Sequence, residues 1–153
     1  METTMQSSVR ATNLFKVAAI TALTMIGYFL LMKLVGLNEK VWLRGLNFFI
    51  LWFGVRYYLK TKREENNGKL EYLIGMKDGF LTALFAGGLF AAFIFIYLNI
   101  DVSFMNYLRT TQPLGNYATP ASSALVILLE GISSGIIIAF ALMHLWNRDK
   151  DHG

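Results

Sequence analysis

The segment "GFLTALFAGGLFAAFIFIYLNI" runs from Gly79 to Ile100 and contains no charged side chain. The hydrocarbon core of a bilayer is about 30 Å thick and is crossed by about 20 apolar residues in helical conformation. A helix also satisfies its backbone hydrogen bonds internally, which a lipid-exposed segment must do. The segment therefore predicts a transmembrane helix.

Three other apolar segments predict further crossings. Residues 14–36 and 121–146 are long enough to span, whereas residues 41–59 have a short uncharged centre between Arg44 and Arg56. The segment at 41–59 spans only if these two side chains extend to opposite interfaces, and the alternative is a re-entrant or surface helix. No small-x-small cleavage site follows residues 14–36, so this segment is interpreted as a retained helix and not as a signal peptide.

The composition agrees with a membrane protein. Apolar residues make up 55% of the chain and charged residues only 16%, against about 25% charged in an average soluble domain. The charges also gather at the ends of the apolar segments. Residues 1–153 are therefore predicted to form one all-α, polytopic domain, a bundle of four transmembrane helices.

The distribution of Lys and Arg predicts the orientation. With four crossings, ten of these residues lie on the side that holds both termini and four on the other side. Because cytoplasmic loops are enriched in Lys and Arg, both termini are predicted to be cytoplasmic. In the opposite loop Val102, Met105 and Leu108 share one helical face, which indicates a short interfacial helix at 102–110.

Small residues recur at every fourth position in the last two predicted spans. Helices in lipid associate through close backbone contact, which small side chains permit. These two helices are predicted to pack on each other, although either small face could instead bind another copy or another protein. The residues are Gly79, Ala83, Gly87 and Ala91 in one span and Gly131, Gly135 and Ala139 in the other.

Glu130 is the one acidic residue inside the last apolar run, "LVILLEGISSGIII". A carboxylate near the bilayer centre costs roughly 2.5–3.5 kcal/mol on insertion scales, which favours burial, protonation or pairing. Glu130 and Ser134 are about 40° apart on the helical wheel, so the carboxyl is predicted to face the bundle. The candidate partners at the same depth are the cations Arg44 and Lys33, with Asn47 or Tyr28 adding a hydrogen bond.

Glu130 has three interpretations. The first is a structural pin that fixes helix register, the second is handling of protons or cations, and the third is contact with a partner protein or lipid. No second carboxylate lies inside the predicted spans, which disfavours a complete proton relay.

Several function classes are excluded or disfavoured. The chain has no cysteine and two histidines near its C-terminal end, so no disulfide, Cys-ligated metal or other metal site is expected. No nucleophile–base pair or phosphate loop is present, and hence no catalytic residue and no cofactor is predicted. The net charge of +4 is explained by topology and anionic lipid, because no basic face with base-stacking residues accompanies it.

The last two spans resemble a known family. The stretch "GMKDGFLTALFAGGLFAAFIFIYLNIDVSFMNYL" ends its helix at Tyr97 and Ile100 and continues with Phe104 and Leu108, and "EGISSGIIIAFALM" precedes a short charged tail. This pattern is similar to a family of small four-helix membrane proteins of unknown function that is common in Bacteroidetes. The resemblance implies a helical bundle in a bacterial inner membrane, and it supplies no ligand or catalytic residue.

Two functions of different classes follow as hypotheses. The first is a non-enzymatic accessory or scaffold subunit that packs against itself or a larger membrane complex. The second is a small oligomeric transporter or channel component that uses the intramembrane carboxylate of Glu130. Membrane lipid, a second copy or a larger complex are the expected partners, and nucleic acid is not.

Overall fold

The structure is a computed structural model, and residues 2–36, 45–112 and 115–148 are described. Within these ranges all regular secondary structure is helical, as the sequence predicts. The described residues contain four long helices, and a short α-helix and a 3-10 turn lie between the last two of them. The elements are α1 (Glu2–Leu34), α3 (Leu46–Glu65), α4 (Tyr72–Ile100), α5 (Val102–Thr111), η1 (Gly115–Tyr117) and α6 (Pro120–Arg148).

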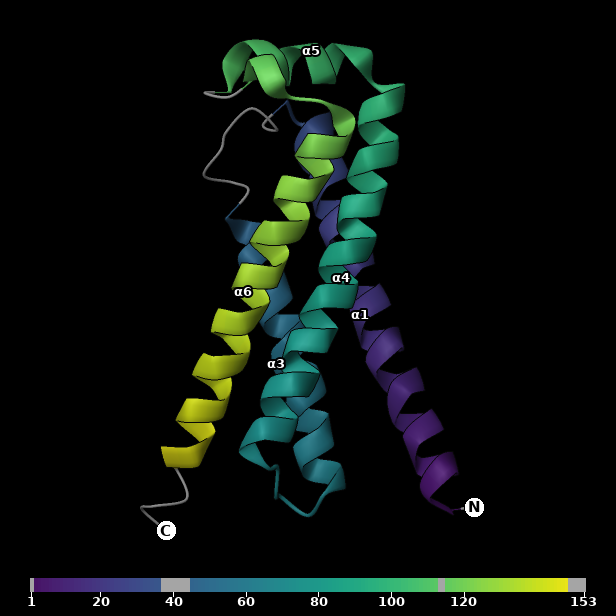
Figure 1. The fold of residues 1–153 in the computed structure, drawn as a ribbon, viewed down its shortest axis with the longest axis vertical. Helices are drawn as coiled ribbons and strands as arrows, with labels where there is room; N and C mark the ends of the chain where they lie inside the picture. Colours follow the sequence, from purple (N-terminus) through teal and green to yellow (C-terminus); the bar gives the residue numbers. More distant parts are fainter. Residues whose placement is uncertain (1, 37–44, 113–114, 149–153) are drawn as a thin grey trace.

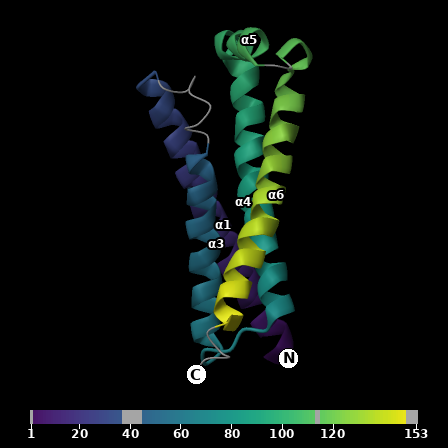
Figure 2. The ribbon, with the colours of Figure 1, turned by 90° about the vertical axis from the view of Figure 1, so that its left-hand side faces the viewer.

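The four long helices run along the long axis of the molecule, and α5 lies across one end of them (Figure 1). In the view turned by 90°, α3 lies to one side of α4 and α6 at the end that carries α5, and α1 crosses behind them, from beside α4 at the lower end to the side of α3 at the upper end (Figure 2). Both chain termini lie at the end opposite α5 in both views. These ends are called the α5 end and the termini end below.

Three of the described helices are long and apolar enough to cross a membrane, at Asn13–Leu34, Tyr72–Ile100 and Pro120–Trp146. The helix α3 is not among them, because its last turns, from Lys60 to Glu65, are dominated by charged side chains. The prediction of four spans therefore has structural support for three helices. Residues 41–44 of the predicted span at 41–59 lie outside the described residues.

The helix α4 is the centre of the bundle. It packs against α1, α3 and α6 along its length and meets α5 at its end, and its contact with α6 is the most extensive between any two described elements. The helix begins at Tyr72, earlier than the predicted start at Gly79. As a result, one acidic residue, Asp78, belongs to the helix and faces the interior.

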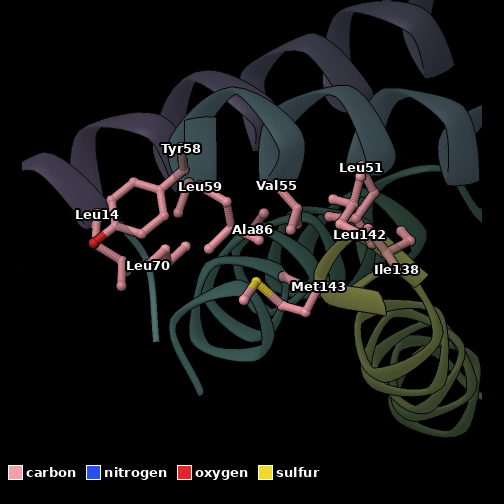
Figure 3. Packing of buried hydrophobic residues seen from close by; sticks show 12 residues of the cluster. Leu14, Leu51, Val55, Tyr58, Leu59, Leu70, Ala86, Ile138, Leu142 and Met143 are labelled. Atoms are coloured by element: carbon pink, nitrogen blue, oxygen red, sulfur yellow. The ribbon is translucent and has the colours of Figure 1, made fainter. Parts of the chain in front are cut away.

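Apolar side chains fill two clusters along the bundle. The cluster toward the termini end includes Leu51, Val55 and Leu59 of α3, and of these Leu51 lies next to Ile138 and Leu142 of α6 (Figure 3). The second cluster, toward the α5 end, contains Met25, Phe90, Ile94, Leu98 and Met105. The interior is therefore formed by side chains from every long helix.

The helix α5 covers the end of the bundle with its apolar face. Met105 is buried and Leu108 half-buried, whereas Asn106 and Arg109 are exposed. Asp101 begins the helix, since its Oδ1 accepts a hydrogen bond from the Phe104 amide at 2.9 Å. A helix is thus present where the sequence predicts a short one, and its polar side is turned away from the bundle.

The start of α6 is fixed by reciprocal capping. The Thr119 hydroxyl accepts from the Ser122 amide at 3.0 Å, and the Ser122 hydroxyl accepts from the Thr119 amide at 2.8 Å. Pro120 occupies the first helical position, where its missing amide hydrogen costs nothing. These three residues set where the last helix begins.

Candidate functional site

The small residues of α4 and α6 meet face to face. A Cβ atom at Gly79 would lie 3.0 Å from the Ala139 Cβ, and one at Gly87 would lie 3.6 Å from the Gly131 Cα. A Cβ at Gly135 would overlap the Ala83 side chain. Ala91, the last small residue of the α4 series, is buried as well. Both small faces are therefore used within the chain, which brings the two backbones close together.

Glu130 is exposed on the outward side of α6, contrary to the prediction that it faces the bundle. The reason is the face by which α6 packs. Gly135 and Ile138 are buried against neighbouring helices, and at 100° per residue Glu130 lies about 140° from Gly135 around the helix. Ser134, which guided the prediction, is only half-buried and lies at the edge of the packed face.

The candidate partners of Glu130 are placed as follows. Lys33 forms an ion pair with Asp101, so its carboxylate partner is not the predicted one. Arg44 lies outside the described residues. Tyr28 and Glu130 both have interaction partners within the protein. Asn47 is half-buried near the start of α3, and among the described residues its buried Oδ1 has no hydrogen-bond donor.

The structure instead gathers polar and aromatic groups at the α5 end. Lys33, from the last turn of α1, pairs with Asp101, which links α4 to α5. The Tyr97 hydroxyl donates to Asp101 Oδ2 at 2.8 Å. The Lys33 Nζ lies 4.6 Å from the centre of the Tyr97 ring and 6.0 Å from that of Phe104. Lys33, Tyr97, Asp101 and Phe104 are called the α5-end cluster below.

The electrostatics of this cluster favour a charged Asp101. The Lys33 ammonium lowers the pKa of the Asp101 carboxyl, and the Phe104 amide hydrogen bond adds to the effect. The side chains of Lys33 and Asp101 are 36% and 21% exposed, so water reaches both groups and screens their attraction. Asp101 is therefore charged at neutral pH, and the cluster is not sealed from solvent.

A second ion pair lies toward the termini end, between α3 and α4. Lys62 pairs with Asp78, and their side chains are only 10% and 13% exposed. One turn along α4, the buried Thr82 hydroxyl donates to the Asp78 carbonyl at 2.8 Å. The pair joins the charged end of α3 to the first turns of α4.

Neither ion pair was predicted, although the sequence holds a signal for each. Asp78 lies on the buried side of α4 with Gly75, Gly79 and Thr82. The predicted span begins at Gly79, one residue later, and so does not include Asp78. Asp101 directly follows an apolar helix and precedes another helical segment, which is the position of an N-cap. The partner lysines come from other helices, and their pairing is a tertiary contact.

The described residues contain no group of three or more His, Asp or Glu side chains that could hold a metal ion. Of the polar groups described above, the α5-end cluster is the one that combines charge, hydrogen bonds and aromatic faces. It is the best candidate for a site, whereas the Lys62–Asp78 pair is nearly enclosed by the fold.

Comparison with known proteins gives one family and no closer relative. No curated protein and no solved structure matches the chain. Residues 16–143 match the model of a family described as a protein of unknown function, DUF4199. This range takes in the apolar part of α1, all of α3, α4 and α5, and nearly all of α6. The chain belongs to the DUF4199 family of proteins of unknown function.

Proposed function

We propose that this protein is a four-span component of a bacterial inner membrane with both termini in the cytoplasm. Its apolar helices support membrane insertion, and helical spans are typical of the inner membrane, since outer-membrane spanning proteins are barrels. The termini share one end of the bundle, as an even number of crossings requires (Figure 2). The excess of Lys and Arg on the termini side supports the cytoplasmic assignment.

The fourth crossing in this proposal is α3. It packs against α1, α4 and α6, so it shares their depth. Its outward aromatic residues, Phe49 and Phe53, are 56% and 67% exposed, which suits contact with lipid chains. A helix that is partly enclosed by three others needs fewer apolar residues than a lipid-facing one, because part of its surface never meets lipid. The lower hydropathy of α3 comes from its charged last turns, Lys60 to Glu65, which lie at the cytoplasmic interface in this proposal.

Within the membrane we assign the protein a non-enzymatic accessory or scaffold role. The observation that carries this proposal is the large exposed surface of α6. This helix is the most apolar of the three candidate spans, with a mean hydropathy of 2.4, and the least enclosed, with 22% of its apolar stretch buried. Its outward side also presents Glu130, which is exposed and has an interaction partner within the protein, and Ser133, whose hydroxyl donates to the Leu129 carbonyl at 2.9 Å. An acidic residue on the outer surface of a span is more typical of contact with protein than with lipid chains.

The same observation counts against transport through a single copy. A carrier or channel of this kind would need the Glu130 carboxylate to line a path inside the bundle. The Glu130 residue is exposed on α6 and has an interaction partner within the protein, while α4 and α6 are in close backbone contact at Gly87 and Gly131. The transporter alternative then depends on an oligomer, and the experiment below would reveal it.

The test is purification of the tagged protein from its native membranes in mild detergent, followed by native mass spectrometry. We expect a stoichiometric complex, with a partner protein or with further copies, for the wild type. Glu130→Gln should reduce the complex, whereas the matched control Glu64→Gln, an exposed acid at the end of α3, should not. A lone monomer in every mild detergent would contradict the accessory role. A homo-oligomer would call for ion flux measurements with Glu130→Gln in proteoliposomes.

A further inference from the structure

The Lys33 ammonium in the α5-end cluster is surrounded as a bound cation would be. It touches the Asp101 carboxylate, and it faces the Tyr97 ring at 4.6 Å and the Phe104 ring at 6.0 Å. Aromatic faces within about 6 Å attract ammonium groups through the ring quadrupole, and a carboxylate adds a charge-assisted hydrogen bond. Recognition of organic ammonium ions in proteins uses this combination of groups.

The receptor part of this cluster is held together without the lysine. Asp101 is fixed from two sides, by the Tyr97 hydroxyl at 2.8 Å and by the Phe104 amide at 2.9 Å. The Phe29 ring makes edge contacts with both aromatic residues, at centroid distances of 5.2 Å to Tyr97 and 6.0 Å to Phe104. The positions of the carboxylate and the two rings therefore depend on contacts among themselves and with Phe29.

Lys33, in contrast, extends into the cluster from a different helix, α1. It lies in the last turn of α1, on a side chain with four rotatable bonds, and it is 36% exposed. An ammonium group from outside could approach from the open side and take its place. Ion pairs of this exposure contribute little to stability, so their exchange costs little.

We propose that the α5-end cluster is a binding site for an organic ammonium ion, which Lys33 occupies in the free protein. The ligand is a quaternary or primary ammonium, supplied either by a free amine or by the amine headgroup of a lipid. The site lies at the end of α4, next to the end of α1, where a lipid headgroup would be at the right height. Binding exchanges one ammonium for another, and no covalent step is involved.

Competition between Lys33 and tetramethylammonium chloride tests the proposal on the intact protein in detergent. The reactivity of each lysine toward an amine-acylating reagent is followed by peptide mass spectrometry. We expect Lys33 to react slowly in sodium chloride and several-fold faster in tetramethylammonium chloride at equal ionic strength. Lys60 is the internal control, because it is 66% exposed and outside the cluster, and its rate should not change. An unchanged rate for Lys33 would overturn the proposal.

A variant without the Lys33 ammonium allows ligand binding to be measured independently, through the melting temperature. Lys33→Met removes the ammonium and keeps the receptor groups, so tetramethylammonium should raise its melting temperature more than that of the wild type. Adding Asp101→Asn to Lys33→Met should abolish the gain, because the carboxylate is lost. If the single and double variants respond equally, the cluster is not an ammonium site.

The source of the ammonium is distinguished by lipid composition. Lys33 reactivity is compared in phosphatidylglycerol vesicles with and without phosphatidylcholine. Faster labelling with phosphatidylcholine would assign the site to a lipid headgroup. A response to the soluble ion alone would assign it to a free amine, and a response to neither would overturn the proposal.

Discussion

Single small residues determine how closely α4 and α6 approach. The two backbones meet at Gly87 and Gly131, and the Ala83 side chain fills the space next to Gly135. In a membrane this close contact stabilises a helix pair, because there is little hydrophobic gain from hiding apolar surface from lipid. Substitutions at these glycines should therefore depend on the neighbouring atoms and not on helix propensity.

Gly135→Ala should destabilise the protein by about 1–3 kcal/mol, because the new methyl group would overlap Ala83 and force the helices apart. The measurement is unfolding in detergent by heat or by SDS titration. Gly88→Ala is the matched control, since a Cβ atom there meets nothing within 4 Å. The control should be neutral or stabilising by up to about 1 kcal/mol, because alanine favours the helix. Equal losses in both variants would contradict the close packing.

Asp101 makes stability depend on pH in the acid range. Its pKa in the folded protein is lowered from 3.8, so its contribution is fully present above that value and is lost as the pH falls through the folded pKa. The wild type should therefore be more stable than Asp101→Asn at neutral pH, and this difference in unfolding free energy should disappear as the pH falls below about 3.8. Melting temperatures of both proteins between neutral and acid pH check this. A constant difference would show that Asp101 is not held as a carboxylate.

At the scale of elements, an ion pair fastens α3 to α4 at the termini end. Lys62 and Asp78 are each about nine-tenths enclosed, so either charge alone would be left with poor solvation. The pair sits where the connection between the helices turns back, with Asn67 and Gly68 in left-handed backbone conformation. The turn and the ion pair together fix how the two helices are aligned.

Removing one partner of this pair should be worse than removing both. Asp78→Leu is expected to destabilise the protein by about 3 kcal/mol or more, because it leaves Lys62 charged in an enclosed position. The double variant Lys62→Met with Asp78→Leu should recover most of that loss, since apolar groups of similar size are tolerated there. A double-mutant cycle of unfolding free energies in detergent provides the measurement. Additive effects would contradict the coupling between α3 and α4.

At the scale of the whole molecule, the two ends of the bundle should face opposite sides of the membrane. The chain lacks cysteine, so a single introduced cysteine can report which side of the membrane it faces, and no native cysteine has to be removed first. Thr110→Cys at the α5 end is exposed, as is Glu65→Cys at the end of α3 near the termini. In intact cells a membrane-impermeant maleimide should label Thr110→Cys and should label Glu65→Cys only after permeabilisation. Equal labelling of both would contradict the proposed four-span topology.

The sequence alone is sufficient to predict the helical class and the candidate spans at α1, α4 and α6, because the length and hydropathy of a segment govern its preference for lipid. Small residues at a spacing of four also pointed to contact between the last two helices, since this spacing is a property of one helix face. Resemblance to a family of unknown function agreed with the match at residues 16–143.

The covered side of each helix and the pairing of charges depend on how the helices pack together. Glu130 was predicted to lie inside from its own helix alone, whereas the packed face of α6 is set by the contact with α4 and leaves Glu130 exposed. The pairs Lys33–Asp101 and Lys62–Asp78 join different helices. Their formation depends on the rotation and relative height of whole helices, which local sequence patterns do not contain.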